Sequence, residues 1–188
     1  MDFTEKELTR EDKFRGRIVY VHVDKVSLPD GGEAFREIVE HPGGVTVIPV
    51  DENGNVTMVR QYRYAFGQNI LETPAGKLEQ GENPLECAVR ELSEETGFTA
   101  DHFVYLGEVL PSPGYCKETL HIYLATGLHA GKAHLDVGEF LATETYHIDT
   151  LMQQVMAGEI TVAKTVIAIM KAKRYLEKGE LNYWQRKF

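Results

Sequence analysis

The sequence predicts an α+β fold, in which a few helices pack on a mixed β-sheet. Three observations support this: segments of alternating apolar and polar residues recur, Gly and Pro separate them, and helical periodicity appears in only three places. A chain of 188 residues can bury a substantial core within one domain and one small extension. We therefore expect helices packed on a sheet that contains both strand directions.

The first part of the chain is expected to be a β-rich extension. After a polar opening of about 13 residues, the stretch 17–41 alternates on both sides of the turn signal PDGG, which predicts a hairpin. We assign residues 1–41 to this N-terminal extension and residues 42–188 to the main domain.

A second hairpin is predicted at the start of the main domain. Its strands would span 45–50 and 56–62, joined across DENGN, where Asn53 and Gly54 readily adopt positive φ. Further strands are expected near 69–72, 103–109, 120–125 and 140–148.

Helices are predicted at 84–96, 150–157 and 162–178. In the first, Asn83 can act as the N-cap, Pro84 suits the first helical position and Gly97 can end the helix in a left-handed conformation. We expect this helix to bury an apolar stripe formed by Leu85, Ala88, Val89, Leu92 and Thr96.

The same helix carries acids where local electrostatics disfavour them. Glu91 and Glu95 lie about 40° apart on the flank of the stripe, with Glu94 farther round. Repulsion one turn apart and the negative helix end each cost a few tenths of a kcal/mol. A divalent cation with oxygen ligands would reverse both effects. The alternative is a solvated acidic face in which Arg90 pairs with Glu94.

Composition limits the classes of function. The chain has 20 basic and 29 acidic residues and a net charge of −9, which argues against nucleic-acid or membrane partners and requires any phosphate to be bound locally. Cys87 and Cys116 form no paired motif, and we expect Cys87 to be a partly buried packing residue. With no apolar run of about 18 residues, a soluble, cytoplasmic protein is expected.

The spacing of the acids matches a known motif, G-x5-E-x7-R-E-U-x-E-E-x-G-U with U apolar, the Nudix box. All nine restricted positions within 23 residues agree. They are Gly76, Glu82, Arg90, Glu91, Leu92, Glu94, Glu95, Gly97 and Phe98. The chain therefore resembles a Nudix hydrolase. This family has an αβα sandwich with a mixed sheet, and its box glutamates hold divalent cations on the pyrophosphate of a nucleoside diphosphate derivative.

The resemblance implies roles for individual residues. Arg90 is expected to orient a glutamate through a charge-assisted hydrogen bond rather than to touch phosphate. The expected cofactor is Mg²⁺, with Mn²⁺ as an alternative. The implied metal ligands are Glu91, Glu94, the central Glu95 and the carbonyl of Ala75, with Glu82 as a weaker candidate.

Three further segments resemble the ADP-ribose pyrophosphatase subgroup. These are SPGY at 112–115, LETPAGKLE before the box and RQYR at 60–63. The resemblance implies substrate contacts from Arg63, Glu72, Pro113 and Gly114, and from Arg36 and Glu37, which often come from the partner subunit in this subgroup. Phe35, Tyr62 and Tyr115 are candidates for stacking on the base, with core or rim packing as the alternative.

The general base is expected in the loop KAHLDVGEFLA. Family members often carry a carboxylate there. Glu139 matches best and is also a candidate metal ligand, while Asp136 is second. His134 is expected to be a solvated surface residue.

The resulting hypothesis is a Mg²⁺-dependent hydrolase that converts ADP-ribose to AMP and ribose 5-phosphate. Hydrolysis of another nucleoside diphosphate sugar, such as GDP-mannose, and a non-catalytic nucleotide-sensing regulator are the alternatives. The subgroup forms homodimers by exchanging N-terminal β segments, so a homodimer is expected. Tyr183, Trp184 and Phe188 are candidates for packing on a partner subunit.

Overall fold

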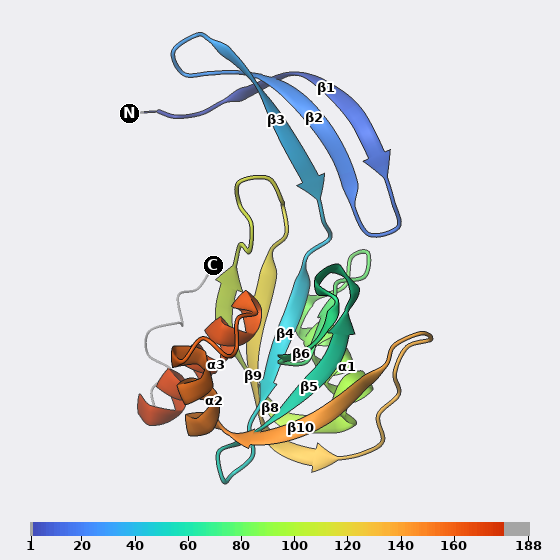
Figure 1. Ribbon diagram of the computed structural model, residues 1–188, viewed down its shortest axis with the longest axis vertical. Helices are drawn as coiled ribbons and strands as arrows, with labels where there is room; N and C mark the ends of the chain where they lie inside the picture. Colours follow the sequence, from blue (N-terminus) through green and yellow to red (C-terminus); the bar gives the residue numbers. More distant parts are fainter. Residues whose placement is uncertain (1, 179–188) are drawn as a thin grey trace. The chain divides into compact units, whose positions relative to one another are not determined.

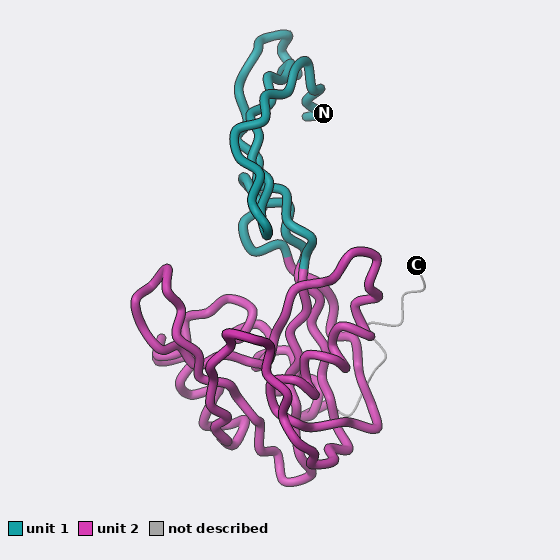
Figure 2. The backbone as a smooth tube through the Cα atoms, turned by 90° about the vertical axis from the view of Figure 1, so that its right-hand side faces the viewer, with its two compact units in different colours: residues 1–43, 110–119 teal, residues 44–109, 120–188 magenta. Residues whose placement is uncertain are grey.

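A computed structural model describes residues 2–178, and the chain divides into two units. One unit comprises residues 1–43 and 110–119, and the other comprises residues 44–109 and 120–188 (Figure 2). The expected partner contacts of Tyr183, Trp184 and Phe188 lie outside the described residues.

The first unit is built on a three-stranded antiparallel sheet. Its strands are β1 (Lys6–Arg15), β2 (Tyr20–Ser27) and β3 (Glu33–Glu40), in the order β1-β2-β3 (Figure 1). The pairing of β2 with β3 confirms the predicted hairpin. Strand β1 lies in the segment that the sequence analysis treats only as a polar opening. All ten of its residues are exposed, so backbone pairing with β2 forms this strand without an apolar alternation to reveal it.

The loop 110–119 also belongs to the first unit, although the strands on either side of it, β8 (Phe98–Val109) and β9 (Leu120–Ala130), belong to the second. The Val39 N–H donates to the Tyr115 carbonyl at 2.8 Å, and the Lys117 N–H donates to the Val39 carbonyl at 2.9 Å. The SPGY segment is thereby held along β3.

The second unit contains two sheets. The first has the order β7-β4-β9-β8, in which β4 and β9 are parallel and the other pairs antiparallel. The second is antiparallel, with the order β10-β5-β6. The bounds are β4 Gly44–Pro49, β5 Asn55–Arg63, β6 Gln68–Glu72, β7 Ala75–Lys77, β8 Phe98–Val109, β9 Leu120–Ala130 and β10 Leu141–His147, with a 3-10 turn at Tyr64–Phe66.

The predicted second hairpin is wrong. The turn at DENGN forms, with φ of 79° at Gly54, but beyond a single bridge between Val50 and Val56 the two strands enter different sheets. Every residue of β4 is buried, and its two edges are occupied by β7 and β9. The alternating pattern predicts a strand correctly but does not specify the partner.

Within residues 2–178, three helices cover the four-stranded sheet from both sides (Figure 1). They are α1 (Pro84–Thr96), α2 (Ile148–Met156) and α3 (Ala163–Lys178), each within two residues of its predicted bounds. Val45 and Val47 pack with α1 on one face, whereas Ile48 packs with α2 and α3 on the other. The α+β prediction, with helices on a mixed sheet, is confirmed. Among the described residues, no helix has the length and apolar character needed to cross a membrane.

Candidate active site

Helix α1 begins and ends where local sequence signals place its termini. The Asn83 side chain accepts a hydrogen bond from the Leu85 N–H at 2.8 Å, and Pro84 occupies the first position. Gly97 adopts the left-handed conformation with φ of 74°. A Cβ atom at Gly97 would lie 2.7 Å from the Ala133 nitrogen, so a side chain would also strain its contact with the 131–140 loop.

The buried face of α1 differs from the predicted apolar stripe. It consists of Cys87, Ala88, Glu91, Leu92 and Glu95. Leu85 and Val89 are 42% and 43% exposed, so the expectation that they are buried is wrong. Glu91 and Glu95 therefore lie in the interior rather than at an exposed edge, and Cys87 is fully buried. Apolar periodicity placed the stripe incorrectly because the chain buries two carboxylates in place of two aliphatic side chains.

Glycine at position 76 makes room for the Glu91 carboxylate. A Cβ atom there would lie 1.8 Å from Oε1 of Glu91, closer than any non-bonded contact allows. A side chain at this position would therefore force the Glu91 carboxylate to move. This close approach accounts for the first glycine of the box.

Glu95 lies beside the residue that precedes this glycine. Its Oε2 accepts a hydrogen bond from the Ala75 N–H at 3.1 Å, and the residue is 4% exposed. Burial raises the pKa of Glu95 to about 8; the Ala75 hydrogen bond opposes the rise, and the nearby charges of Glu91 and Glu139 add to it. A compensating positive charge at this position would favour the ionised form.

Arg90 binds three glutamates. Its Nε and Nη2 donate to the two carboxylate oxygens of Glu82 at 2.9 and 3.0 Å, and its Nη1 donates to Glu91 at 2.6 Å and Glu94 at 3.0 Å. These bonds lower the pKa of Glu82 to about 2, whereas burial raises the pKa of Glu91 despite the guanidinium. The contacts agree with the expected orienting role. The Arg90–Glu94 pair of a solvated acidic face is also present, but Glu91 and Glu95 are not solvated.

The donor set suits a hard divalent cation. The two buried carboxylates, Glu91 and Glu95, are oxygen ligands of the kind that Mg²⁺ and Mn²⁺ prefer. Within residues 2–178, however, no three acidic, histidine or cysteine side chains converge closely enough to hold a metal ion. In this arrangement Arg90 donates to one oxygen of Glu91 and to one oxygen of Glu94.

A second buried charge cluster is centred on Glu72, whose side chain is 3% exposed. Arg63 donates to both carboxylate oxygens at 2.6 and 2.9 Å, and the Lys164 ammonium donates to Oε2. Burial opposes ionisation of Glu72, but the hydrogen bonds from Arg63 and Lys164 outweigh it and lower its pKa. The structure thus brings Arg63 and Glu72 together, as their predicted common site requires.

Lys164 belongs to no motif that would indicate its place in this cluster. The residue lies 92 positions after Glu72, in the first turn of α3. A cation at this positive end of a helix dipole is locally unfavourable, and that is the only sequence signal for it.

The 131–140 loop is tied to the end of α1. The His134 N–H donates to the Glu94 carbonyl at 2.9 Å, and the His134 side chain is exposed, as predicted. Glu139 is half-buried, and its negative charge helps to raise the pKa values of Glu91 and Glu95. The second base candidate, Asp136, is exposed.

Four of the expected substrate residues belong to the first unit. Arg36 and Glu37 lie on β3, and Pro113 and Gly114 lie in the loop held along that strand. Arg36 donates to both carboxylate oxygens of Glu5, at 2.9 and 2.5 Å. The stacking candidates Phe35 and Tyr115 in this unit, and Tyr62 in the second unit, are all exposed rather than in the core.

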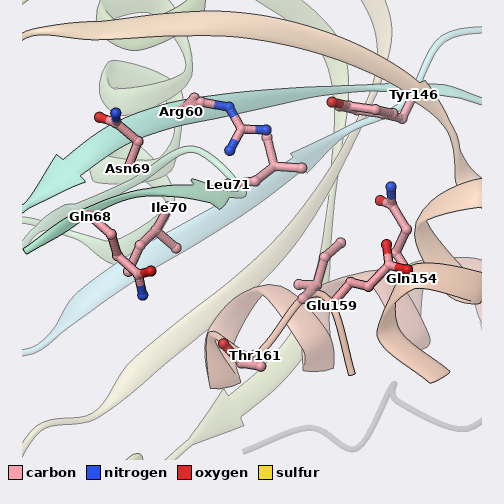
Figure 3. Close-up of a pocket in the computed structure, with 10 residues that line it drawn as sticks. Arg60, Gln68, Asn69, Ile70, Leu71, Tyr146, Gln154, Glu159 and Thr161 are labelled. Atoms are coloured by element: carbon pink, nitrogen blue, oxygen red, sulfur yellow. The ribbon is translucent and has the colours of Figure 1, made fainter. Parts of the chain in front are cut away.

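Arg60, the other arginine of RQYR, does not contact Glu72. Its Nη2 donates to Glu144 on β10 at 3.0 Å. It lines a cavity of about 260 Å³ together with Tyr146 on β10, residues of β6 and residues near the start of α3 (Figure 3). None of the predicted site residues lines this cavity.

Comparisons with known proteins identify the family of this chain. The NUDIX domain family model matches residues 40–164. The chain is 42% identical to the methanol dehydrogenase activator of Bacillus methanolicus, over 89% of this chain and 91% of that protein. It is 40% identical to an ADP-ribose pyrophosphatase of Bacillus subtilis (strain 168), over 88% of this chain and 90% of that protein. Its fold resembles the crystal structure of an ADP compounds hydrolase, with a TM-score of 0.84 and 22% identity over 95% of this chain and 98% of that one.

Proposed function

Because the chain belongs to the Nudix family, we propose that it hydrolyses the pyrophosphate bond of ADP-ribose to give AMP and ribose 5-phosphate. The observation that carries this proposal is the burial of Glu91 and Glu95 side by side at the complete box. The 40% identity to an ADP-ribose pyrophosphatase supports the choice of substrate. GDP-mannose and related nucleoside diphosphate sugars remain the alternative substrates to be compared with it.

Nudix ADP-ribose pyrophosphatases generally depend on a divalent metal. We propose Mg²⁺ as this metal here, with Mn²⁺ as an alternative. The residues that would hold it are Glu91, Glu94, Glu95, the Ala75 carbonyl and Glu139. Bound there, the cation would neutralise charge on the pyrophosphate and favour attack by water.

The residues around this centre would bind the substrate and transfer a proton. Arg90 would hold the box glutamates in place through its charge-assisted hydrogen bonds. Arg63, fixed by Glu72, would present its remaining N–H groups to a phosphate oxygen. Glu139 is our candidate for accepting a proton from the attacking water, with Asp136 second.

We propose that the N-terminal extension, residues 1–41, contributes to substrate binding and to a homodimer. Arg36, Glu37, Pro113 and Gly114 would contact the substrate, from the same or the partner subunit. The exposed apolar side chains of this unit, among them Phe14 and Phe35, are suited to being covered by a second copy. Light scattering at micromolar concentration should give the mass of a dimer, and a monomeric mass would contradict this part of the proposal.

The decisive experiment incubates the chain with Mg²⁺ and a panel of ADP-ribose, GDP-mannose and other nucleoside diphosphate sugars, in ¹⁸O-labelled water. We expect ADP-ribose to be the preferred substrate and AMP and ribose 5-phosphate to be the products. The position of the label identifies the phosphorus that is attacked. Preference for another nucleoside diphosphate sugar would overturn the proposed substrate, and absence of any hydrolysis would overturn the proposed activity.

A second candidate function is regulation of a dehydrogenase. The methanol dehydrogenase activator is 42% identical over most of both chains. Adding the chain to a methanol dehydrogenase and measuring its rate tests this directly. If Glu95→Gln abolishes hydrolysis but preserves stimulation, regulation is independent of the proposed chemistry.

A further inference from the structure

Three buried threonine hydroxyls lie in a row between the four-stranded sheet and α3. Oγ1 of Thr46 is 2.7 Å from Oγ1 of Thr73, which is 3.3 Å from Oγ1 of Thr165. All three residues have no exposed surface. They come from β4, from the link between β6 and β7, and from the first turn of α3, so the row joins three segments that are far apart in the sequence.

The hydrogen bonds of this row run in one direction. Thr46 donates its hydroxyl proton to the Pro74 carbonyl at 3.0 Å and must therefore accept the proton of Thr73. Thr73 in turn accepts from the hydroxyl of Thr165. Thr165 has an acceptor role as well, because the Thr73 N–H donates to its Oγ1 at 3.1 Å. Each hydroxyl both donates and accepts, so the removal of one leaves a buried partner unsatisfied.

The segment held by this row carries both charge clusters of the candidate site. It runs from Glu72, which binds Arg63, to Ala75, whose N–H donates to Glu95. Thr73 and Pro74 lie between them and supply the groups that the row holds. A displacement of Thr73 therefore shifts Glu72 and Ala75 together. Because the Ala75 N–H is the hydrogen-bond donor to the Glu95 carboxylate, this contact shifts as well.

We propose that Thr46, Thr73 and Thr165 form a positioning network for the Glu95 carboxylate, through which the start of α3 determines the geometry of the divalent-cation site. The inference rests on the proposed function insofar as Glu95 is a metal ligand. Thr165 is the key residue because it is the acceptor for the backbone of the linking segment. A purely structural network would stabilise the fold without affecting metal binding.

The test compares Thr165→Val with Thr165→Ser. Valine keeps the size of the side chain but removes the hydroxyl, whereas serine keeps the hydroxyl and removes a methyl group. Thr57→Val, at a buried threonine of β5 outside the network, is the matched control. Mn²⁺ affinity is measured by electron paramagnetic resonance. Steady-state assays with ADP-ribose and Mg²⁺ give kcat and KM, and circular dichroism gives Tm.

We expect Thr165→Val to weaken Mn²⁺ binding about 10-fold and to lower kcat by a similar factor, the usual size for loss of a group that orients a metal ligand. Thr165→Ser should stay within about threefold of the wild type for both quantities, and Thr57→Val should leave Mn²⁺ affinity unchanged. If Thr165→Val lowers Tm but keeps wild-type Mn²⁺ affinity and kcat, the network is structural and the inference is overturned.

If Thr165→Val does not fold, Thr46→Val provides the test, because it removes the other end of the row and leaves the Thr73 N–H paired. It should weaken Mn²⁺ binding in the same direction, and unchanged Mn²⁺ affinity would overturn the inference. A wild-type chain that binds Mn²⁺ but does not cleave ADP-ribose would refute the proposed function alone, since the Mn²⁺ affinities of the variants still decide the inference. A wild-type chain that does not bind Mn²⁺ would overturn both.

Discussion

The two faces of the β10-β5-β6 sheet carry the same ion pair in different surroundings. Arg63 binds Glu72 on one face, and Arg60 binds Glu144 on the other. The two arginines are three residues apart on one strand, so the strand period directs them to opposite faces. The side chain of Glu72 is 3% exposed, whereas that of Glu144 is 28% exposed.

The difference shows how burial and neighbouring charges separate two chemically equivalent pairs. Glu72 has a second cation, Lys164, and Arg63 interacts electrostatically with Glu95 and Glu139. Glu144 instead accepts hydrogen bonds from Arg60 and Tyr146, which line the cavity in Figure 3. We therefore expect the Arg63 pair to matter for the reaction and the Arg60 pair to matter for stability.

The largest effect is expected at Glu95, a buried acid whose charge interacts with Arg63. Glu95→Gln should lower kcat by at least about 100-fold, because it removes a charge that the proposed metal site needs. Steady-state assays with ADP-ribose and Mg²⁺ measure this. Glu86→Gln, at an exposed acid in the first turn of the same helix, is the control. Wild-type turnover of Glu95→Gln would refute the metal assignment.

A substitution at Glu139 tests whether the 131–140 loop takes part in the chemistry. Glu139→Gln should lower kcat by about 10- to 100-fold, a smaller or similar loss, as expected for a base whose role water can partly replace. Steady-state assays with ADP-ribose and Mg²⁺ measure this loss. An unchanged rate would transfer the assignment to Asp136, which Asp136→Asn would then test.

The same substitution at both arginines tests whether the Arg63–Glu72 and Arg60–Glu144 pairs differ in function. Arg63→Lys should lower kcat/KM about 10-fold, because an ammonium cannot replace a two-pronged guanidinium contact. Arg60→Lys should leave kcat/KM within about twofold, since this pair lies on the opposite face. Equal losses of kcat/KM would show that the two faces are not functionally distinct.

The smallest effect concerns stability and pH. Hydrogen bonds from Arg60 and Tyr146 lower the pKa of Glu144 from 4.5 to about 2. A carboxyl with a lower pKa in the folded state stabilises the fold above its unfolded pKa and loses this contribution as the pH falls through the folded value. Glu144→Gln should therefore reduce the free energy of unfolding by about 1 kcal/mol at pH 7, allowing for solvent screening.

Urea denaturation of wild type and Glu144→Gln at several pH values measures this contribution. The difference in the free energy of unfolding should be constant above about pH 4.5 and shrink as the pH falls toward 2. A difference that grows on acidification would contradict the assignment.

Much of α1 could be predicted from the sequence because its signals are local. Asn83, Pro84 and Gly97 act within one helical turn of the ends, and the box spacing identifies the acids without knowledge of the fold. The buried face could not be obtained in this way. Leu85 and Val89 are apolar but exposed, while Glu91 and Glu95 are buried, because the site overrides the usual relation between polarity and burial.

Strand partners show the same limit. The segments on either side of DENGN have the correct pattern, yet β4 pairs with β7 and β9, and β5 pairs with β6 and β10. Lys164 and the threonine network likewise involve contacts across as many as 92 residues. No local pattern records such contacts.

The sequence by itself determined the helices and their termini, most of the strands, the mixed α+β class and the set of acids that defines the family. Tertiary structure alone decided which carboxylates are buried, that Lys164 joins the Glu72 cluster and that SPGY lies along β3. The physical reason is range. Capping and periodicity act over a few residues, whereas burial, the pairing of charges and the partner of a strand depend on segments that meet only in the folded chain.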